Sequence, residues 1–172
     1  IGANDGIRVD GDARDDFFVA TQIAKAAKDG GFDLVLTGRE SIDYNGGSVP
    51  GFVAAMLDYG FVKGCIGLDV EGSTAKAVRE IDGGKETVEV TLPAVFAGQK
   101  GLVDEAALRI PNMRGIMQAR TKQINVVAPE ATETKVEVVG YEKPVSRGNV
   151  TLVDKDNVAE LVRLLHEEAK VI

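Results

Sequence analysis

Residues 34–59 read LVLTGRESIDYNGGSVPGFVAAMLDY, and this stretch decides the fold class. With Asp33 before it, the stretch begins with a continuous apolar run that ends at Gly38. Such a run predicts a strand buried on both faces in a parallel sheet. A polar, Gly-rich loop follows. A helix is then predicted from about Ser48 to Tyr59, with Pro50 in its first turn. Strand, loop and helix in this order are the repeating unit of an α/β fold.

The residues before this stretch repeat the same order. Residues 6–10 form a short strand candidate, and a helix is predicted in DARDDFFVATQIAKAAKDGG, residues 12–31. Asp15 and Asp16 suit its N-terminus and Gly30-Gly31 its end. One helical face is marked by Val19, Ile23, Ala26 and Ala27. Strand–helix–strand–helix order at this spacing favours right-handed crossovers and a parallel sheet.

The rest of the chain has a different pattern. Strands are predicted at 65–71, 74–81, 85–91 and 93–98. Gly83-Gly84 indicates a hairpin with a type I′ turn, because both central residues of that turn need positive φ. We therefore expect an antiparallel hairpin added to the parallel sheet. Residues 128–150 contain two prolines and predict a linker or an arm. An amphipathic helix is expected at 154–169, with His166 beside its acidic, solvated face.

Composition excludes several classes of protein. The chain has 172 residues, a net charge of −7, one Cys and one His. A disulfide framework and a cysteine-rich zinc site are excluded, and the charge argues against a nucleic-acid binder that works by general basicity. No apolar run approaches the ~20 residues that span a bilayer, and we expect a cytoplasmic protein. Cys65 is expected to pack inward from a strand. Since the chain begins at Ile1 without Met, we expect a missing N-terminal segment.

The loop before the second helix is the best candidate ligand site. In open α/β sheets, ligands lie outside the carboxyl ends of the strands, and a helix N-terminus suits a phosphate. Gly46 and Gly47 would let the backbone approach an anion, Ser48 would add a hydroxyl, and Asp43 would hold the loop or bind a ribose or an adenine amine. Alternatively, the glycines form a tight turn and Ser48 is only an N-cap. The loop matches neither GxGxxG nor a P-loop.

Three blocks of sequence resemble the β-subunit of electron transfer flavoprotein. They are TGRESIDYNGGSVPG (37–51), VREIDGGKETVEVTLPAVFAG (78–98) and RIPNMRGIMQARTKQI (109–124), in the order of that family. The resemblance implies a Rossmann-like, doubly wound, mostly parallel sheet similar to adenine-nucleotide α-hydrolases. It implies a nucleotide-binding domain at 1–127, whose N-terminal strands are missing, and a C-terminal arm and helix at 128–172 that pack on an α-subunit.

The resemblance also implies the cofactors and their ligands. The α-subunit would carry most of an FAD site, and the β-subunit would bind AMP, or a second FAD in electron-bifurcating members. After Ile42-Asp43 the loop follows neither the AMP-type nor the bifurcating pattern, so both nucleotides stay open. The residues that match the family's nucleotide contacts are Ser41, Asp43, Tyr44, Asn45, Gly46, Gly47, Ser48 and Val49.

Residues 106–129 form a basic segment. They contain four cationic residues and no acidic one, so the rest of the chain carries −11. Met113 is expected in a short loop before a helix at 115–120, as an apolar anchor ringed by cations, which suits a transient protein contact. The alternative is that Met113 packs internally and the cations are solvated. By resemblance, the segment docks a dehydrogenase such as an acyl-CoA dehydrogenase of fatty acid oxidation. The docking residues would be Arg109, Met113, Arg114, Ile116, Met117 and Arg120.

Three functions follow from these patterns. The first, which the resemblance implies, is a non-catalytic electron-carrier subunit, and the scarcity of residues suited to acid–base catalysis agrees with it. The second is a bifurcating β-subunit whose FAD oxidises NADH. The third, from another class, is a stand-alone nucleotide-sensing module that resembles universal stress proteins. A hydrolase that uses Asp43 lacks a second catalytic group.

Overall fold

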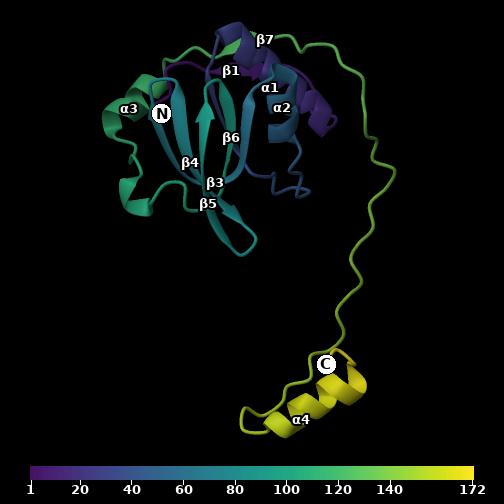
Figure 1. Ribbon diagram of the computed structural model, residues 1–172. Coiled ribbons are helices and arrows are strands. Elements are labelled where there is room, and N and C mark those ends of the chain that lie inside the picture. Colours follow the sequence, from purple (N-terminus) through teal and green to yellow (C-terminus); the bar gives the residue numbers. More distant parts are fainter. The chain divides into compact units, whose positions relative to one another are not determined.

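The computed structural model describes residues 1–172 and divides into two units, Ile1–Glu137 and Val138–Ile172. The first unit is an α/β structure, which confirms the predicted class (Figure 1). Its elements are β1 (Ile7–Val9), α1 (Asp16–Gly30), β2 (Leu34–Gly38), α2 (Val49–Leu57), β3 (Gly60–Glu71), β4 (Thr74–Ile81), β5 (Gly84–Thr91), β6 (Ala94–Gly98), α3 (Met113–Ala119) and β7 (Asn125–Val127).

The strands form one mixed sheet and one small parallel sheet. The five-stranded sheet has the order β2-β6-β3-β4-β5. Its strands β2, β6 and β3 are parallel, and β4 and β5 add antiparallel ladders, as the predicted hairpin requires. β1 pairs in parallel with β7 in a separate two-stranded sheet. Among the three parallel strands, β6 comes last in the sequence but lies between β2 and β3 in the sheet.

Strand β3 is longer than predicted and changes partners along its length. Gly60–Lys63 pair in parallel with β6, whereas Gly67–Glu71 pair with β4 in the antiparallel sense. The register shifts between Lys63 and Cys65, where Gly64 has φ of 70°. A left-handed conformation of this kind is accessible to glycine at little cost. The prediction that the strand begins at residue 65 was wrong, because residues 60–64 owe their conformation to pairing with β6.

The predicted hairpin is present, but its turn differs. Ile81 pairs with Gly84, so the two loop residues are Asp82 and Gly83 rather than Gly83 and Gly84. Only Gly83, at φ of 85°, has the positive value that a type I′ turn needs at both positions. The predicted type I′ turn was therefore wrong in two respects. It was placed one residue too late in the chain, and the turn is not of type I′.

Helix α1 begins and ends where the sequence predicts. Asp15 caps it by accepting a hydrogen bond from the Phe18 N–H at 2.7 Å, and Gly31 ends it in the left-handed region. Its buried face is rotated relative to the prediction, since Val19, Ile23 and Ala26 are only half-buried. The fully buried residues are Phe18, Ala20, Gln22, Ala24 and Ala27. The difference arises because α1 packs against both α2 and the segment that follows β7.

Strand β2 is less buried than its apolar sequence predicts. It pairs with β6 on one side only, and Leu36 is 57% exposed. The prediction that β2 is buried on both faces was wrong for this structure, because its second edge has no neighbouring strand. Helix α2 is also shorter than predicted, since Asp58 ends it in the left-handed conformation.

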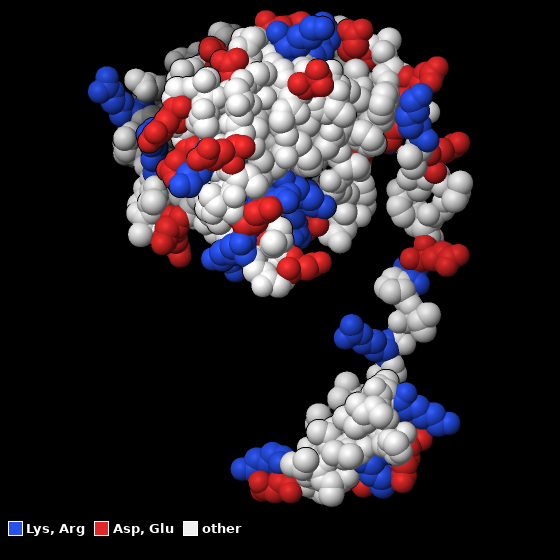
Figure 2. Space-filling model, viewed as in Figure 1, with Lys and Arg blue, Asp and Glu red and all other residues white.

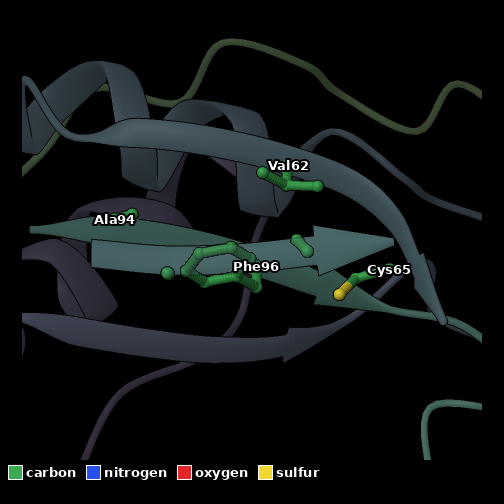
Figure 3. Close-up of a cluster of buried hydrophobic side chains, with 6 residues drawn as sticks. Val62, Cys65, Ala94 and Phe96 are labelled. Carbon is green, nitrogen blue, oxygen red and sulfur yellow. The ribbon is translucent and has the colours of Figure 1, made fainter. Parts of the chain in front are cut away.

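The core consists of two clusters on opposite faces of the sheet. On one face, α1 and α2 lie side by side and bury Ala20, Val53 and Ala54 against Val95. On the other, Phe96 and Val62 pack with Cys65, and β4 contributes Ala75 and Ala77 (Figure 3). Cys65 is fully buried, as predicted, and burial raises the pKa of its thiol.

The second unit contains one helix. α4 (Val158–Arg163) continues into a π-helical turn at Leu164–Glu168, and Asn157 caps it by accepting from the Glu160 N–H. His166 is exposed on this helix, as predicted, and Val158, Leu161 and Val162 are exposed too. Residues 138–157 form no helix or strand. No helix of the structure has the length and apolar character needed to cross a bilayer.

Candidate functional site

The candidate loop, residues 39–48, lies at the carboxyl edge of the parallel strands. It leaves β2 at Gly38, which pairs with Gly98 at the end of β6, and Cys65 of β3 pairs with the same glycine. The parallel pairing of β2, β6 and β3 therefore ends at one edge, although β3 continues to Glu71, and the loop leads from that edge into α2. This is the place where α/β proteins bind ligands.

Hydrogen bonds within the loop fix its shape. The Ser41 N–H donates to the Gly46 carbonyl at 2.8 Å, which closes the loop on itself. The Tyr44 N–H donates to Asp43 Oδ1 at 3.0 Å, and Asn45 takes a positive φ of 62°. The structure thus brings together the predicted residues from Ser41 to Ser48. It places the left-handed residue at Asn45 rather than at the two glycines.

Ser41 has a buried hydroxyl that lacks a regular partner. The Ser41 hydroxyl faces the Asp43 carboxyl and holds the pKa of that group below its usual value, with help from the Tyr44 N–H. Ser41 Oγ completes no hydrogen bond of regular geometry, and neither does Thr37 Oγ1 in β2. A buried hydroxyl without a regular partner is able to donate to a bound ligand.

Asp16 holds the loop from outside, and the sequence reasoning missed this role. Its carboxylate accepts hydrogen bonds from the hydroxyls of Tyr44 and Ser48. The contact with Asp16 raises the pKa of the Tyr44 hydroxyl. An acidic residue in the first turn of a helix is already explained by the helix dipole. Nothing in the sequence around Asp16 therefore indicated a contact with the loop.

The start of α2 is open to a ligand. Ser48 stands at the N-cap but its side chain makes no capping hydrogen bond, which argues against the alternative that it serves only as a cap. The N–H groups of Val49 and Gly51 make no hydrogen bond, and Pro50 has none to give. Free amides at a helix N-terminus suit a phosphate. Together with the Ser41 hydroxyl, these amides offer hydrogen-bond donors to an anionic ligand.

A polar groove of about 490 Å³ extends from the same sheet edge, and the sequence reasoning did not single it out. Arg39 Nη1 donates to Gln99 Oε1 at 3.1 Å, and Gln99 in turn contacts Glu80. Arg79 pairs with Glu86 at 2.5 Å. Cations and carboxylates are paired in this groove. The signal available in the sequence was the REIDGG run, which places charged side chains at the hairpin beside the strand ends.

The basic segment presents its anchor residue to solvent. Met113 is 73% exposed, which contradicts the alternative that it packs internally. It is the first residue of α3 rather than part of a loop, because Asn112 caps the helix by accepting from the Gly115 N–H at 2.8 Å. Met117 is also exposed and Ile116 is half-buried.

The cations of this segment are free. Arg109, Arg114 and Arg120 are exposed and form no salt bridge. Over the face of the molecule in view, positive and negative side chains are otherwise interspersed (Figure 2). No hydrogen bond joins this segment to the candidate loop, so the two are separate surfaces. No group of three or more His, Cys, Asp or Glu residues could hold a metal ion.

Comparison with known proteins identifies relatives of the chain. The family model described as "Electron transfer flavoprotein domain" matches residues 1–132, which include the candidate loop and the basic segment. The chain is 35% identical over 145 residues to the "Electron transfer flavoprotein subunit beta" of Syntrophomonas wolfei, covering 84% of this chain and 56% of that protein. Proteins of the same name from Bacillus subtilis and Homo sapiens are 30% and 32% identical, with 67% and 60% of their lengths covered. The chain thus spans about three fifths of these relatives.

Proposed function

Since the chain belongs to the electron transfer flavoprotein family, as a β-subunit, we propose that it forms half of a heterodimeric electron carrier. Its partner would be an α-subunit that holds most of an FAD. The pair would relay electrons from a dehydrogenase, such as an acyl-CoA dehydrogenase, to a downstream acceptor. The chain itself would be a carrier subunit rather than an enzyme, and we expect it in the cytoplasm.

The loop of residues 39–48 carries the proposal of nucleotide binding. It joins a parallel strand to a helix whose first amides are free, and it contains the orphaned Ser41 hydroxyl. These donors would hold the phosphate of an AMP or of a second FAD, while Asp43, Tyr44 and Asn45 would shape the loop around it. The flavin, when bound, supplies the electron chemistry. This chain's residues bind the nucleotide and position it against the sheet edge.

Mass spectrometry of the nucleotides released from the intact heterodimer tests the proposal. One flavin and one AMP per heterodimer would support a simple carrier, and two flavins would support the bifurcating type that oxidises NADH. A heterodimer that releases no adenine nucleotide beyond one FAD would contradict nucleotide binding by this loop. Homodimers that bind nucleotide without an α-subunit would instead support the sensing module.

A pair of variants separates binding from folding. Ser41→Ala removes the orphaned hydroxyl, and we expect the nucleotide dissociation constant to rise about tenfold, the effect of one hydrogen bond of ~1.4 kcal/mol. Thr37→Val is the matched control, because it also removes a buried hydroxyl without a partner but lies in β2. Both variants should fold as well as the original protein. Equal affinities in both variants would count against the loop as the binding site.

We propose two partner surfaces. The exposed Met113 and the unpaired arginines around it would dock the dehydrogenase, because complementary charge speeds a transient encounter. Residues 128–172 would pack on the α-subunit as an arm and a helix with exposed Val158, Leu161 and Val162. Limited proteolysis with and without the α-subunit tests the second surface. Equal cleavage rates in both states would contradict it.

The finer fold assignment is also part of the proposal. We propose a Rossmann-like, doubly wound sheet in a nucleotide-binding domain at 1–127. The parallel arrangement of β2, β6 and β3 supports the Rossmann-like part, and α1 and α2 both lie on one face of the sheet. Residues 128–137 nevertheless group with the first unit, because Gln22 and Asp15 of α1 bind their backbone.

A further inference from the structure

Asp16 lies where two helices begin, and it contacts both. It stands in the first turn of α1 and accepts hydrogen bonds from Ser48, at the start of α2, and from Tyr44 of the loop. Helix N-termini attract anions, so both helices favour a carboxylate at this place. The mouth of the proposed nucleotide site therefore holds a negative charge.

The contact between Ser48 and Asp16 shapes what α2 offers to a ligand. A serine at an N-cap usually accepts a hydrogen bond from its own helix, which would occupy one of the first amides. The Ser48 hydroxyl instead gives its single proton to Asp16, and the N–H groups of Val49 and Gly51 stay free. A phosphate that binds these amides comes next to Ser48, and so close to the Asp16 carboxylate.

The charge of that phosphate then decides how well it binds. A phosphate monoester carries up to two negative charges near neutral pH, because its second pKa is about 6. Each phosphate in the diphosphate bridge of a dinucleotide carries one. At roughly 5 Å in a water-exposed site, repulsion by one carboxylate reduces affinity about fourfold for each unit of ligand charge. The second phosphate of the bridge lies farther from Asp16 than the first and is repelled less, so the summed penalty is larger for the monoester.

We propose that Asp16 is a specificity-determining residue of this site, which disfavours a dianionic phosphate monoester and so favours a nucleotide with a diphosphate bridge. The inference rests on the proposed function, because it requires an adenine nucleotide in the loop. It names Asp16, which lies outside the loop, as the residue that selects between the two ligand classes left open above. It also accounts for the hydrogen bond that the Ser48 hydroxyl makes with Asp16 instead of with an amide of its own helix.

Calorimetric titration of the heterodimer, freed of its adenine nucleotide, tests the proposal. The probes are adenosine, AMP and ADP-ribose, which place zero, two and one negative charges on the phosphate nearest the ribose. In Asp16→Asn we expect AMP to bind about 16-fold tighter, ADP-ribose at least about fourfold but less than about 16-fold tighter, and adenosine with unchanged affinity. In about 1 M salt the gain for AMP should largely disappear, because charges are screened beyond about 3 Å.

The controls distinguish charge from structure. Asp12→Asn removes an exposed carboxylate before α1 and should leave all three affinities unchanged. Asp16→Ser repeats the test with a second uncharged residue suited to the first turn of a helix, in case the asparagine variant does not fold. Weaker binding of all three probes in both Asp16 variants would show that Asp16 only supports the loop, and would overturn the inference. An equal gain for adenosine and AMP would overturn it too. Failure of the unaltered heterodimer to bind any probe would overturn the proposed nucleotide site itself.

Discussion

Gln22 is the buried polar side chain that fastens residues 128–137 to helix α1. Only 8% of it is exposed, and its amide makes two hydrogen bonds with the backbone of Glu130. Oε1 accepts from the Glu130 N–H at 2.7 Å, and Nε2 donates to the Glu130 carbonyl at 3.0 Å. Gln22→Leu fills the same space with an apolar group and removes both bonds. We predict that it loosens the attachment of the segment to α1 around Glu130 without unfolding the sheet, while Asp15 still accepts hydrogen bonds from the Lys135 and Val136 N–H groups.

The two bonds set the size of the effect. A hydrogen bond within a protein contributes about 0.5–1.5 kcal/mol net, so the pair contributes about 1–3 kcal/mol. The open state of residues 128–137 should then become about fivefold to 150-fold more populated. Gln22→Glu should have an intermediate effect, because a carboxylate still accepts from the Glu130 N–H but cannot donate to its carbonyl.

Hydrogen exchange with mass spectrometry measures this population directly. In the intact heterodimer, peptides covering residues 128–137 should exchange faster in Gln22→Leu by the factor given above. Peptides from β6 should be unchanged. Gln118→Leu is the matched control, since Gln118 is exposed and its side chain makes no hydrogen bond. Exchange of residues 128–137 at the original rate in Gln22→Leu would refute the argument that these two bonds anchor the segment.

Further predictions concern the core, pH and partner docking. Phe96→Ala should lower the free energy of unfolding by about 3–5 kcal/mol in denaturant titration. Phe61→Ala, at a site that is 40% exposed, should lower it much less, and equal losses of stability would contradict the assignment of the core. Hydrogen bonds from the Phe18 N–H and from two backbone amides beyond β7 hold the pKa of Asp15 below its ordinary 3.8. The ionised form therefore stabilises the fold above that pH, and the contribution is lost as the pH falls through the lower, folded-state value. Unfolding midpoints should fall more steeply below about pH 4 in the original protein than in Asp15→Asn, and parallel curves would contradict this. Met113→Asp should slow electron transfer from the dehydrogenase mainly by weakening docking, and Arg114→Glu mainly by slowing association at low salt; stopped-flow rates that neither variant changes would exclude α3 as the docking surface.

Local sequence patterns predicted where helices begin and end better than they predicted how deeply a strand is buried and which strand it pairs with. The Asp15 cap and Gly31 end of α1 have their own stereochemical signals, and both were predicted correctly. The burial of β2 was not, because it depends on whether a second strand lies beside it. The start of β3 was missed for a related reason. Residues 60–64 become a strand by pairing with β6, more than 30 residues later in the chain, and a single-chain pattern contains no information about such a partner.

The sequence predicted the loop of the candidate site, but not the contacts that distant residues make with that loop. The glycines, the position after a strand and the helix start of α2 indicated residues 41–49. Asp16 was not predicted to touch them, because it lies more than 20 residues away in a different helix and its local role already accounted for it. The same holds for the contact between Asp15 and the backbone of residues 135–136. Contacts between distant segments decide how a loop is held.

The position of β6 in the sheet has a consequence for the order in which the protein is made. The ribosome produces β2 and the candidate loop before β6, so β2 finds its neighbour only when residues 94–98 have emerged, more than 50 residues later. At about 5–20 residues per second, this delay lasts several seconds. The hairpins of β3, β4 and β5 join nearby segments and can form meanwhile. The candidate loop is thus synthesised before β6 but is set in place only after β6 has paired with β2.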